Sequence, residues 1–394
     1  MIEYDDPASF RGQLQRGRGA AARRAPTEPG AADAVYECVV TDTRWDRQVE
    51  QRDSYLARLI TRLALPLAPI EQHLSSHNDE DDEPVELALQ VLALLPMIGR
   101  LDAVAVLRRY ATEGPHWATA LEAISTSGAM KLPAIWCDTE PWTTFARSQP
   151  RIRRIVDQRK SSQARPHHSQ KSTTYETEDL MRLVAAGGPE RRQALEELGR
   201  RGDRTVLDLA EDSALRNATG WTPGIAQALH HLGPAALPRA RIWIAGDDNT
   251  LVALGERVLA EVGDRSDASQ LLSALRRATT AGNWCAAEIP ARGLGRLKIP
   301  EAATDLMAAW EDTVHSPARE AFLEALQGCA PHNADAVAAE ALDDCEPTVQ
   351  RRACEGVPDT TAVRSRLQEL ADDPLTPEIH EAANTKLLLL TKGL

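Results

Sequence analysis

Aromatic side chains are scarce in this 394-residue chain, at 4% of its residues, although 43% of the residues are hydrophobic. Sandwiches of β-sheets depend on aromatic and β-branched residues, so this composition argues against them. Alanine and leucine supply much of the apolar content instead, and both favour closely packed helices. The sequence therefore predicts an all-α protein with a sizeable buried core.

Paired cysteines and long hydrophobic runs are also missing. None of the six cysteines forms a Cys-x-x-Cys pair, which argues against a zinc ribbon or a disulfide framework. The N-terminal stretch MIEYDDPASF is acidic and has no apolar core of a signal peptide. The most apolar run, residues 85–99, is interrupted by Glu86, Gln90 and Pro96, and it is shorter than the roughly 20 residues that a membrane helix needs. We therefore expect reduced thiols, a cytoplasmic location and no membrane span.

Motifs that carry catalysis are absent as well. The chain has no G-x-x-x-x-G-K-[ST] phosphate loop and no G-x-S-x-G nucleophile elbow. His73 and His77 stand four residues apart, so a helix would place both on one face, but no third metal ligand can be named. The adjacent histidines at 167–168 would not converge on one ion, and those at 230–231 are expected to pack between helices. The sequence thus predicts no catalytic, cofactor or metal site.

Acidic residues outnumber basic ones, and the net charge is -13. This balance argues against a protein whose whole surface binds nucleic acid. Basic residues nevertheless gather in two stretches. Residues 11–25 contain five arginines and no acid, and residues 147–171 contain six arginines and two lysines against one aspartate.

The second basic stretch lies in a polar segment, residues 147–175, whose composition predicts a mobile insertion. Three interpretations stay open: a solvated linker between two half-solenoids, a basic tether for an acidic partner or nucleic acid, and a strap on the protein's own acidic face. In the tether interpretation, the contacts of the anionic partner would be Arg147, Arg151, Arg153, Arg154, Arg159, Lys160 and Arg165.

A short pattern recurs in the second half of the chain. The spacing Leu198-x-x-x-Gly202-Asp203 returns as Leu259-x-x-x-Gly263-Asp264. Predicted turns follow one another at a mean interval of about 31 residues, at Asp203, Pro234, Asp264, Pro300, Pro331 and Asp359. Such a period is typical of stacked helical hairpins, which bury their apolar stripes against one another.

The first half is similar but looser. Residues 86–114 read as two helices around a turn at Gly99, and residues 116–133 follow as another helical segment. Residues 52–74 form a plausible hairpin bent at Leu65-Pro66. We therefore expect an N-terminal helical half, a basic insertion and a C-terminal solenoid, with bounds 1–146, 147–175 and 176–394.

The helix, LG-x-x-GD turn and second helix resemble the HEAT repeat, in particular its short bacterial form in phycobilisome-lyase-like HEAT proteins and actinobacterial HEAT-like proteins. The resemblance covers residues 176–394 and implies an armadillo-like, right-handed α-solenoid. It also implies a ladder between an arginine early in one helix and an aspartate in a turn. The ladder candidates are Arg191 or Arg192, Asp203, Asp264, Arg351 or Arg352, and Asp359. Prolines at three of the turns make the ladder partial.

This fold class predicts a non-catalytic scaffold that presents a concave groove to a protein partner. One alternative is a HEAT-like DNA glycosylase acting on alkylated bases, with Trp221, Trp243, Trp284 or Trp310 stacking on the lesion near Asp312. The acidic balance opposes it, and tryptophans at repeat spacing are usually inter-repeat core. A third hypothesis is an accessory subunit of a modifying enzyme, although no cofactor motif is present.

Overall fold

The computed structural model describes residues 3–77, 81–127, 144, 175–188, 190–215 and 221–392, without the side chains of residues 221–223. All regular secondary structure in these ranges is helical, which confirms the predicted all-α class. None of the described helices has the length and apolar character needed to cross a bilayer.

Contacts group the chain into two compact units. Unit 1 consists of residues 1–165, 311–320 and 334–394, and unit 2 consists of residues 166–310 and 321–333. Unit 1 therefore joins segments that are far apart in the sequence. The bounds 1–146, 147–175 and 176–394 stay predictions.

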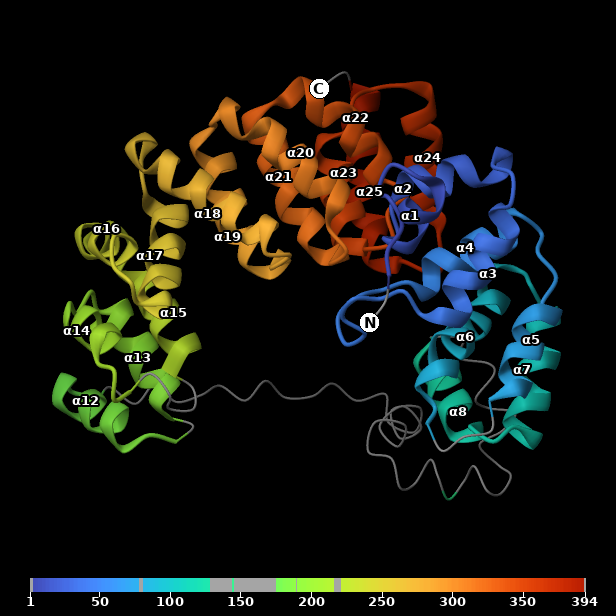
Figure 1. Cartoon of the computed structure of the whole chain (residues 1–394), viewed down its shortest axis with the longest axis horizontal. Coiled ribbons are helices and arrows are strands. Elements are labelled where there is room, and N and C mark those ends of the chain that lie inside the picture. The colour runs from blue at the N-terminus through green and yellow to red at the C-terminus, as the bar shows by residue number, and fades with distance from the viewer. Residues whose placement is uncertain are drawn as a thin grey trace. The chain divides into compact units, whose positions relative to one another are not determined.

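Unit 1 combines helices from both ends of the chain, drawn in blue to teal and in red in Figure 1. The N-terminal helices are α1 (Phe10–Gln15), α2 (Gly19–Arg24), α3 (Ala31–Thr41), α4 (Asp53–Arg62), α5 (Ala68–Ser76), α6 (Glu83–Leu94), α7 (Asp102–Glu113) and α8 (Trp117–Thr126), with the short 3-10 helices η1 (Ala25–Thr27) and η2 (Leu95–Ile98). The C-terminal helices are most of α22 (Pro331–Ala341), α23 (Pro347–Gly356), α24 (Thr361–Asp372), η7 (Pro377–Ile379) and α25 (His380–Lys392).

Local signals account for the helix breaks in this part of the chain. The predicted turn at Gly99 separates η2 from α7, and Gly99 has a φ of 90°, which glycine adopts at little cost. The chain also breaks at Leu65-Pro66, between α4 and α5, as the sequence predicts. The apolar run of α6 is buried between neighbours, where Leu87, Leu89 and Leu92 lie in the core.

Unit 2 contains the central helices, which run from green to orange in Figure 1. They are α12 (Thr177–Ala186), α13 (Glu190–Arg200), α14 (Thr205–Glu211), α15 (Trp221–Leu232), η3 (Gly233–Ala236), α16 (Leu237–Ile244), α17 (Asn249–Val262), η4 (Arg265–Asp267), α18 (Ala268–Thr280), α19 (Trp284–Leu297), η5 (Pro300–Ala302) and most of α20 (Ala303–Asp312). The next helix, α21 (Arg319–Cys329), follows the 3-10 helix η6 (Ser316–Ala318).

The predicted turns all fall where helices end or begin. Asp203, Asp264 and Asp359 lie between consecutive α-helices, and the prolines at 234, 300 and 331 lie in or at the start of the following helical segment. Two of the helices that follow a turn begin with a side-chain cap. Asp248 accepts hydrogen bonds from the backbone at the start of α17, and Asn283 does so for α19.

Alternate helices of unit 2 pack on one another. Helix α13 contacts α15, α15 contacts α17, and α17 contacts α19, while α16 pairs with α17 and α18 with α19. The side chains between them are mainly leucine and alanine, and Leu195, Leu198, Leu259, Leu271 and Leu294 are fully buried. Each helix therefore buries an apolar stripe against neighbours rather than within its own hairpin.

Candidate functional site

Side-chain bridges in unit 2 join positions that are about one repeat apart. Arg239 of α16 donates to Glu211 at 2.6 Å across 28 residues. The indole Nε1 of Trp243 donates to the same carboxylate at 2.7 Å across 32 residues. Arg276 of α18 forms a two-fold pair with Asp305 of α20, at 3.1 and 2.9 Å across 29 residues. These contacts span 28 to 32 residues, close to the predicted interval between turns, whereas the bridge of Arg241 with Asp264 spans 23.

Close backbone approaches in unit 2 have the same spacing. A Cβ atom at Gly199 would lie 2.4 Å from the Cα of Ala228, and one at Gly295 would lie 2.6 Å from the Cα of Ala325. Real Cβ atoms do not tolerate such contacts, so these two helix pairs close up only because glycine has no side chain. Small residues thus set the spacing of successive helical pairs.

The predicted ladder residues do not form one continuous ladder. Asp264 does join an inter-helix bridge, but its partner is Arg241 of α16, at 3.0 Å, and this arginine also binds Asp267 at 2.8 Å. Arg191 turns back and donates to the carbonyl of Val184 at 2.8 Å. That carbonyl lies in the last turn of α12, where backbone acceptors have no partner within the helix.

Of the other ladder candidates, Arg352 lies 3.6 Å from Glu320 of α21, whereas the two aspartates make local contacts. Asp203 accepts from the backbone of Thr205 at 3.0 Å, at the start of α14. Asp359 pairs with Arg364 of the following helix at 2.6 Å. Arg351 lines a cavity of about 480 Å³ beside α25. The bridging arginines of unit 2 lie in α16, α18 and α19, as in the pairs of Arg239 with Glu211, Arg276 with Asp305 and Arg292 with Glu324.

A groove of about 580 Å³ lies at the connections of two successive hairpins of unit 2. We call it the turn groove, and it is lined by Arg265, Ser266, Ala268, Ser269, Leu272, Ile299, Pro300 and Glu301. Its lining combines an apolar part, with Leu272 and Pro300, and a polar part, with two serines and one charge of each sign. This mixture is suited to an extended peptide segment, whose backbone needs hydrogen-bond partners beside apolar contacts.

Charged residues from both ends of the chain meet inside unit 1. We call this group the junction cluster, and each member is at most 4% exposed: Glu50, Arg52, His315, Ser316, Arg319, Asp344, Cys345 and Glu346. Buried charges of this kind are stable only when they are paired and hydrogen-bonded. The partners of each side chain in the cluster therefore decide whether it is a structural or a reactive group.

Two arginines neutralise the acids of the junction cluster. Arg319 forms a two-fold pair with Asp344, at 2.8 and 2.9 Å. Arg52 donates to the hydroxyl of Ser316 at 2.8 Å and to the sulfur of Cys345 at 2.7 Å. Both contacts of Arg52 span more than 260 residues of sequence, so the cluster ties the two ends of the chain together.

The thiol and the hydroxyl of the junction cluster contact charged side chains that are themselves buried. Burial raises the pKa of the Cys345 thiol well above its ordinary value, and the nearby arginines offset this only in part. The thiol therefore stays protonated and is a poor nucleophile. The hydroxyl of Ser316 donates to Glu346 at 2.5 Å, while His315 Nδ1 lies 3.1 Å from Glu50. The serine thus bonds a carboxylate rather than an imidazole base.

The basic stretch at residues 11–25 supplies further contacts to the C-terminal helices. Arg18 forms a two-fold pair with Glu340, at 2.9 and 3.0 Å. The carbonyl of Gly17 accepts the backbone N–H of Cys345 at 2.9 Å. Sequence reasoning missed this role. A run of arginines without acids was visible, but nothing in the sequence identifies carboxylates some 300 residues away as their partners.

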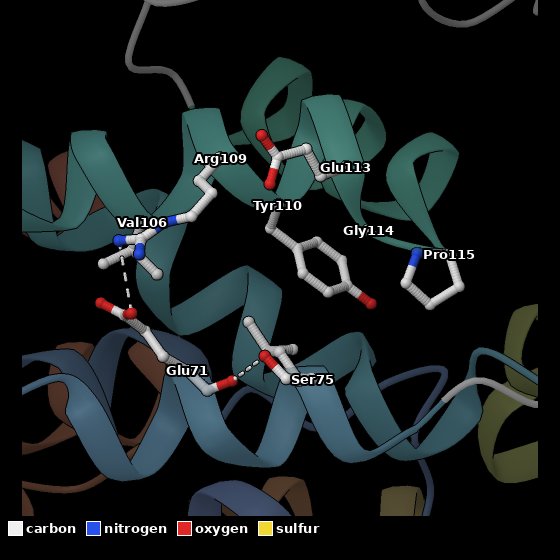
Figure 2. Close-up of a pocket in the computed structure, with 9 residues that line it drawn as sticks. Glu71, Ser75, Val106, Arg109, Tyr110, Glu113, Gly114 and Pro115 are labelled. Atoms are coloured by element: carbon white, nitrogen blue, oxygen red, sulfur yellow. Dashed lines mark hydrogen bonds and ion pairs between the residues drawn. The ribbon is translucent and has the colours of Figure 1, made fainter.

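A smaller cavity of about 270 Å³ lies between α5 and α7 in unit 1 (Figure 2). Figure 2 shows the Arg109 guanidinium directed at the Glu71 carboxylate, and the two groups are 3.4 Å apart. The hydroxyl of Ser75 donates to the backbone carbonyl of Glu71 at 2.8 Å. The charged pair that faces this cavity is therefore satisfied internally.

The glycosylase hypothesis required exposed indole rings. Trp243, Trp284 and Trp310 are at most 8% exposed, so their faces are not free for stacking on a base. The side chain of Trp221 lies outside the described residues. These observations agree with the structural interpretation of the tryptophans as core residues.

Two other sequence-based hypotheses concern histidines and basic residues. His73 donates to the carbonyl of Pro84 at 2.9 Å, and His77 Nδ1 lies 2.9 Å from the carbonyl of His73, so backbone acceptors occupy these nitrogens. The seven basic residues assigned to an anionic partner, between positions 147 and 165, lie outside the described residues. Their contact with nucleic acid or an acidic partner stays a prediction.

Comparison with known proteins adds no family to these observations. No family model matches the chain, and no curated protein matches it. The function is therefore argued from the contacts of the chain itself.

Proposed function

We propose that this protein is a non-catalytic scaffold built as a HEAT-like α-solenoid, which holds a protein partner between successive hairpins of unit 2. The observation that carries the proposal is the recurrence of side-chain contacts at one-repeat spacing, including Arg239 with Glu211 and Arg276 with Asp305. A hairpin that contacts only its neighbours is the elementary unit of a solenoid. Repeat proteins of this kind use extended surfaces to bind other proteins.

A scaffold is favoured over an enzyme by the chemistry of the buried polar groups. In the junction cluster the serine, histidine and cysteine side chains contact carboxylates and guanidinium groups that hold two chain segments together. Their low exposure also keeps substrate away from them. The buried tryptophans of unit 2 likewise support a packing role rather than base recognition.

The turn groove is the surface that we assign to the partner. It lies at consecutive repeat connections, and its volume of about 580 Å³ accommodates a few residues of an extended chain. Ser269 is exposed at its edge and Leu272 is half-buried within it. We expect the partner to insert an apolar side chain against Leu272 and to bond its backbone to the serines.

Site-specific photocrosslinking in the native host tests this assignment. A photoreactive benzoylphenylalanine at Ser269 should give one discrete crosslinked protein, identified by mass spectrometry. The same group at Gln270, the next and also exposed residue of α18, points about 100° away around the helix and serves as the matched control.

A further substitution distinguishes binding in the turn groove from non-specific contact with the surface. Leu272→Glu places a charge in the apolar part of the groove and should abolish the crosslink from Ser269. Equal crosslinking from Ser269 and Gln270, or a crosslink that survives Leu272→Glu, would contradict the proposed site. Helicity measured by circular dichroism should be unchanged in all three proteins.

A further inference from the structure

A polar cavity in unit 1 borders the junction cluster, with which it shares Glu50. It has a volume of about 320 Å³, which is at the lower end of the range for small-molecule sites. The polar cavity is lined by Arg44, Glu50, Gln51, Asp53, Ser54, Gln90, Leu94, Ala123, Thr126, Ser127 and Leu375. These residues come from the loop before α4, from α4, α6 and α8, and from the segment before η7.

Two of the three charged groups in the lining are already paired. Arg44 forms a two-fold pair with Asp42, at 2.8 and 2.7 Å. Glu50 accepts from Arg52 at 3.4 Å, and its other oxygen lies 3.1 Å from His315 Nδ1. Neither Arg44 nor Glu50 is therefore free to neutralise a ligand.

The third charged group, Asp53, has no cation. Its carboxylate accepts the backbone N–H of Ser54 at 2.7 Å, and no basic side chain of the described residues forms an ion pair with it. Burial raises the pKa of this carboxyl, and Arg44 and Arg58 oppose the shift only from a distance. A partly buried acid without a close cation is a group that a cationic ligand would stabilise.

The residue after Asp53 carries an unpartnered hydroxyl. Ser54 is 4% exposed, and its Oγ has no hydrogen-bond partner among the described residues. Buried side-chain hydroxyls nearly always have a partner. The lining therefore contains a carboxylate without an ion pair and, on the next residue, a hydroxyl without a partner, together with the apolar side chains of Leu94, Ala123 and Leu375.

These groups match an alkylammonium ion. An ammonium group has three donors and no acceptor, so it can bond the carboxylate and the hydroxyl at once. We propose that the polar cavity binds a primary ammonium group at Asp53 and Ser54, with a short alkyl chain against Leu94 and Leu375. A divalent metal ion fits less well, because it needs more oxygen ligands than one free carboxylate and one hydroxyl.

Calorimetric titration of the full chain with 1-butylamine and 1-butanol tests the charge requirement. We expect saturable binding of the amine with one site per chain, and no binding of the alcohol, which has the same carbon chain but no charge. Binding of both compounds with equal affinity, or of neither, would overturn the proposal.

Variants then place the site. Asp53→Asn should weaken butylamine binding by about tenfold or more, since it removes the charged partner. Ser54→Ala should weaken it by about fivefold, the value of one hydrogen bond. Glu122→Gln is the matched control, because this exposed residue of α8 carries the same charge but does not line the cavity. If Asp53→Asn and Glu122→Gln lose the same amount of butylamine affinity, the binding depends only on the negative surface charge, and the assignment is overturned.

The same titration distinguishes two sources of the ammonium group. N-acetyl-lysine methylamide carries a lysine side chain on a peptide-like backbone. If it binds as tightly as butylamine, the cavity accepts a lysine of a polypeptide, and if it does not bind, the cavity takes a free small amine. The melting temperature of Asp53→Asn should match that of the wild type or exceed it, because the variant removes a partly buried charge that has no ion pair.

Discussion

At the scale of single residues, the most constrained side chains are the arginines of the junction cluster. Arg319 and Asp344 are both fully buried and form a two-fold pair. Removing one partner leaves the other as a buried charge without compensation, which is far more costly than losing an exposed pair.

Asp344→Asn should therefore lower the free energy of unfolding by about 3–5 kcal/mol. The amide keeps the shape of the carboxylate but cannot neutralise Arg319. Chemical denaturation followed by circular dichroism measures the loss. Arg276→Gln breaks an exposed pair in unit 2 and should leave the denaturation midpoint nearly unchanged. Similar midpoints for the two variants would show that the junction pair is not needed for stability.

The cysteines offer a second test at this scale. Burial raises the pKa of Cys38 and of Cys354 to about 12 and also raises that of Cys345, whereas Cys285 is exposed. Iodoacetamide reacts with the thiolate, so at pH 8 it should label Cys285 first and leave the three buried thiols unlabelled until the protein unfolds. Peptide mass spectrometry reads the order, and early labelling of Cys345 would contradict the burial argument.

At the scale of elements, glycine decides how closely the N-terminal helices approach the C-terminal ones. Gly17 has a φ of 68°, and a Cβ atom there would lie 2.5 Å from the sulfur of Cys345. Gly30 has a φ of 76°, but nothing lies within 4 Å of its Cβ position. The two positions thus share the left-handed backbone and differ only in the close approach.

Gly30→Ala should cost about 1–2 kcal/mol of stability from the left-handed backbone alone. Gly17→Ala should cost clearly more, because it also separates the segment before α2 from Cys345. Denaturation midpoints give the difference, and limited proteolysis should show cleavage near α1 and α2 in Gly17→Ala only. Equal costs for the two variants would mean that the contact with Cys345 contributes nothing.

The bridge between α16 and the turn after α17 gives a pH-dependent test. The hydrogen bond from Arg241 holds the pKa of Asp267 below its ordinary value. An acid with a lowered pKa in the folded state adds stability above its unfolded pKa, about 3.9, and this stability is lost as the pH falls through the lower, folded value.

Asp267→Asn should therefore lower the melting temperature at pH 7, and its difference from the wild type should shrink as the pH falls below about 3.9. Thermal unfolding between pH 7 and pH 3 measures both curves. Asp247→Asn, at an exposed position nearby, should change the melting temperature little. A gap that stays constant down to pH 3 would contradict the role of the ionised carboxylate.

At the scale of the whole molecule, the two ends of the chain belong to one compact unit. Contacts such as that of Arg52 with Cys345 span 293 residues, so the N-terminal and C-terminal helices of unit 1 should lose protection together.

Arg52→Met should raise amide hydrogen exchange in both α4 and α23, because it leaves Glu50 and Glu346 without their arginine. Exchange in α17 and α18, which lie in unit 2, should stay at the wild-type rate. Mass spectrometry of peptic fragments resolves these regions. Faster exchange in α4 alone would show that the ends unfold independently.

The sequence by itself determined the helical class and the positions of the helix breaks. Both depend on local chemistry: alanine and leucine favour helices, while glycine, proline and aspartate end or begin them. The turns from Asp203 to Asp359 and at Gly99 could therefore be predicted from short windows, as the structure confirms.

Only the tertiary structure decided which charges meet. The predicted ladder placed Arg191 opposite turn aspartates, but this arginine bonds a carbonyl of the preceding helix, and Arg241 takes Asp264 instead. The junction cluster and the polar cavity gave no sequence signal, because their residues come from distant segments, as in the contact of Arg52 with Cys345 across 293 residues. Helix periodicity reports which face of a helix is apolar, whereas the partner of a buried charge depends on how distant segments pack.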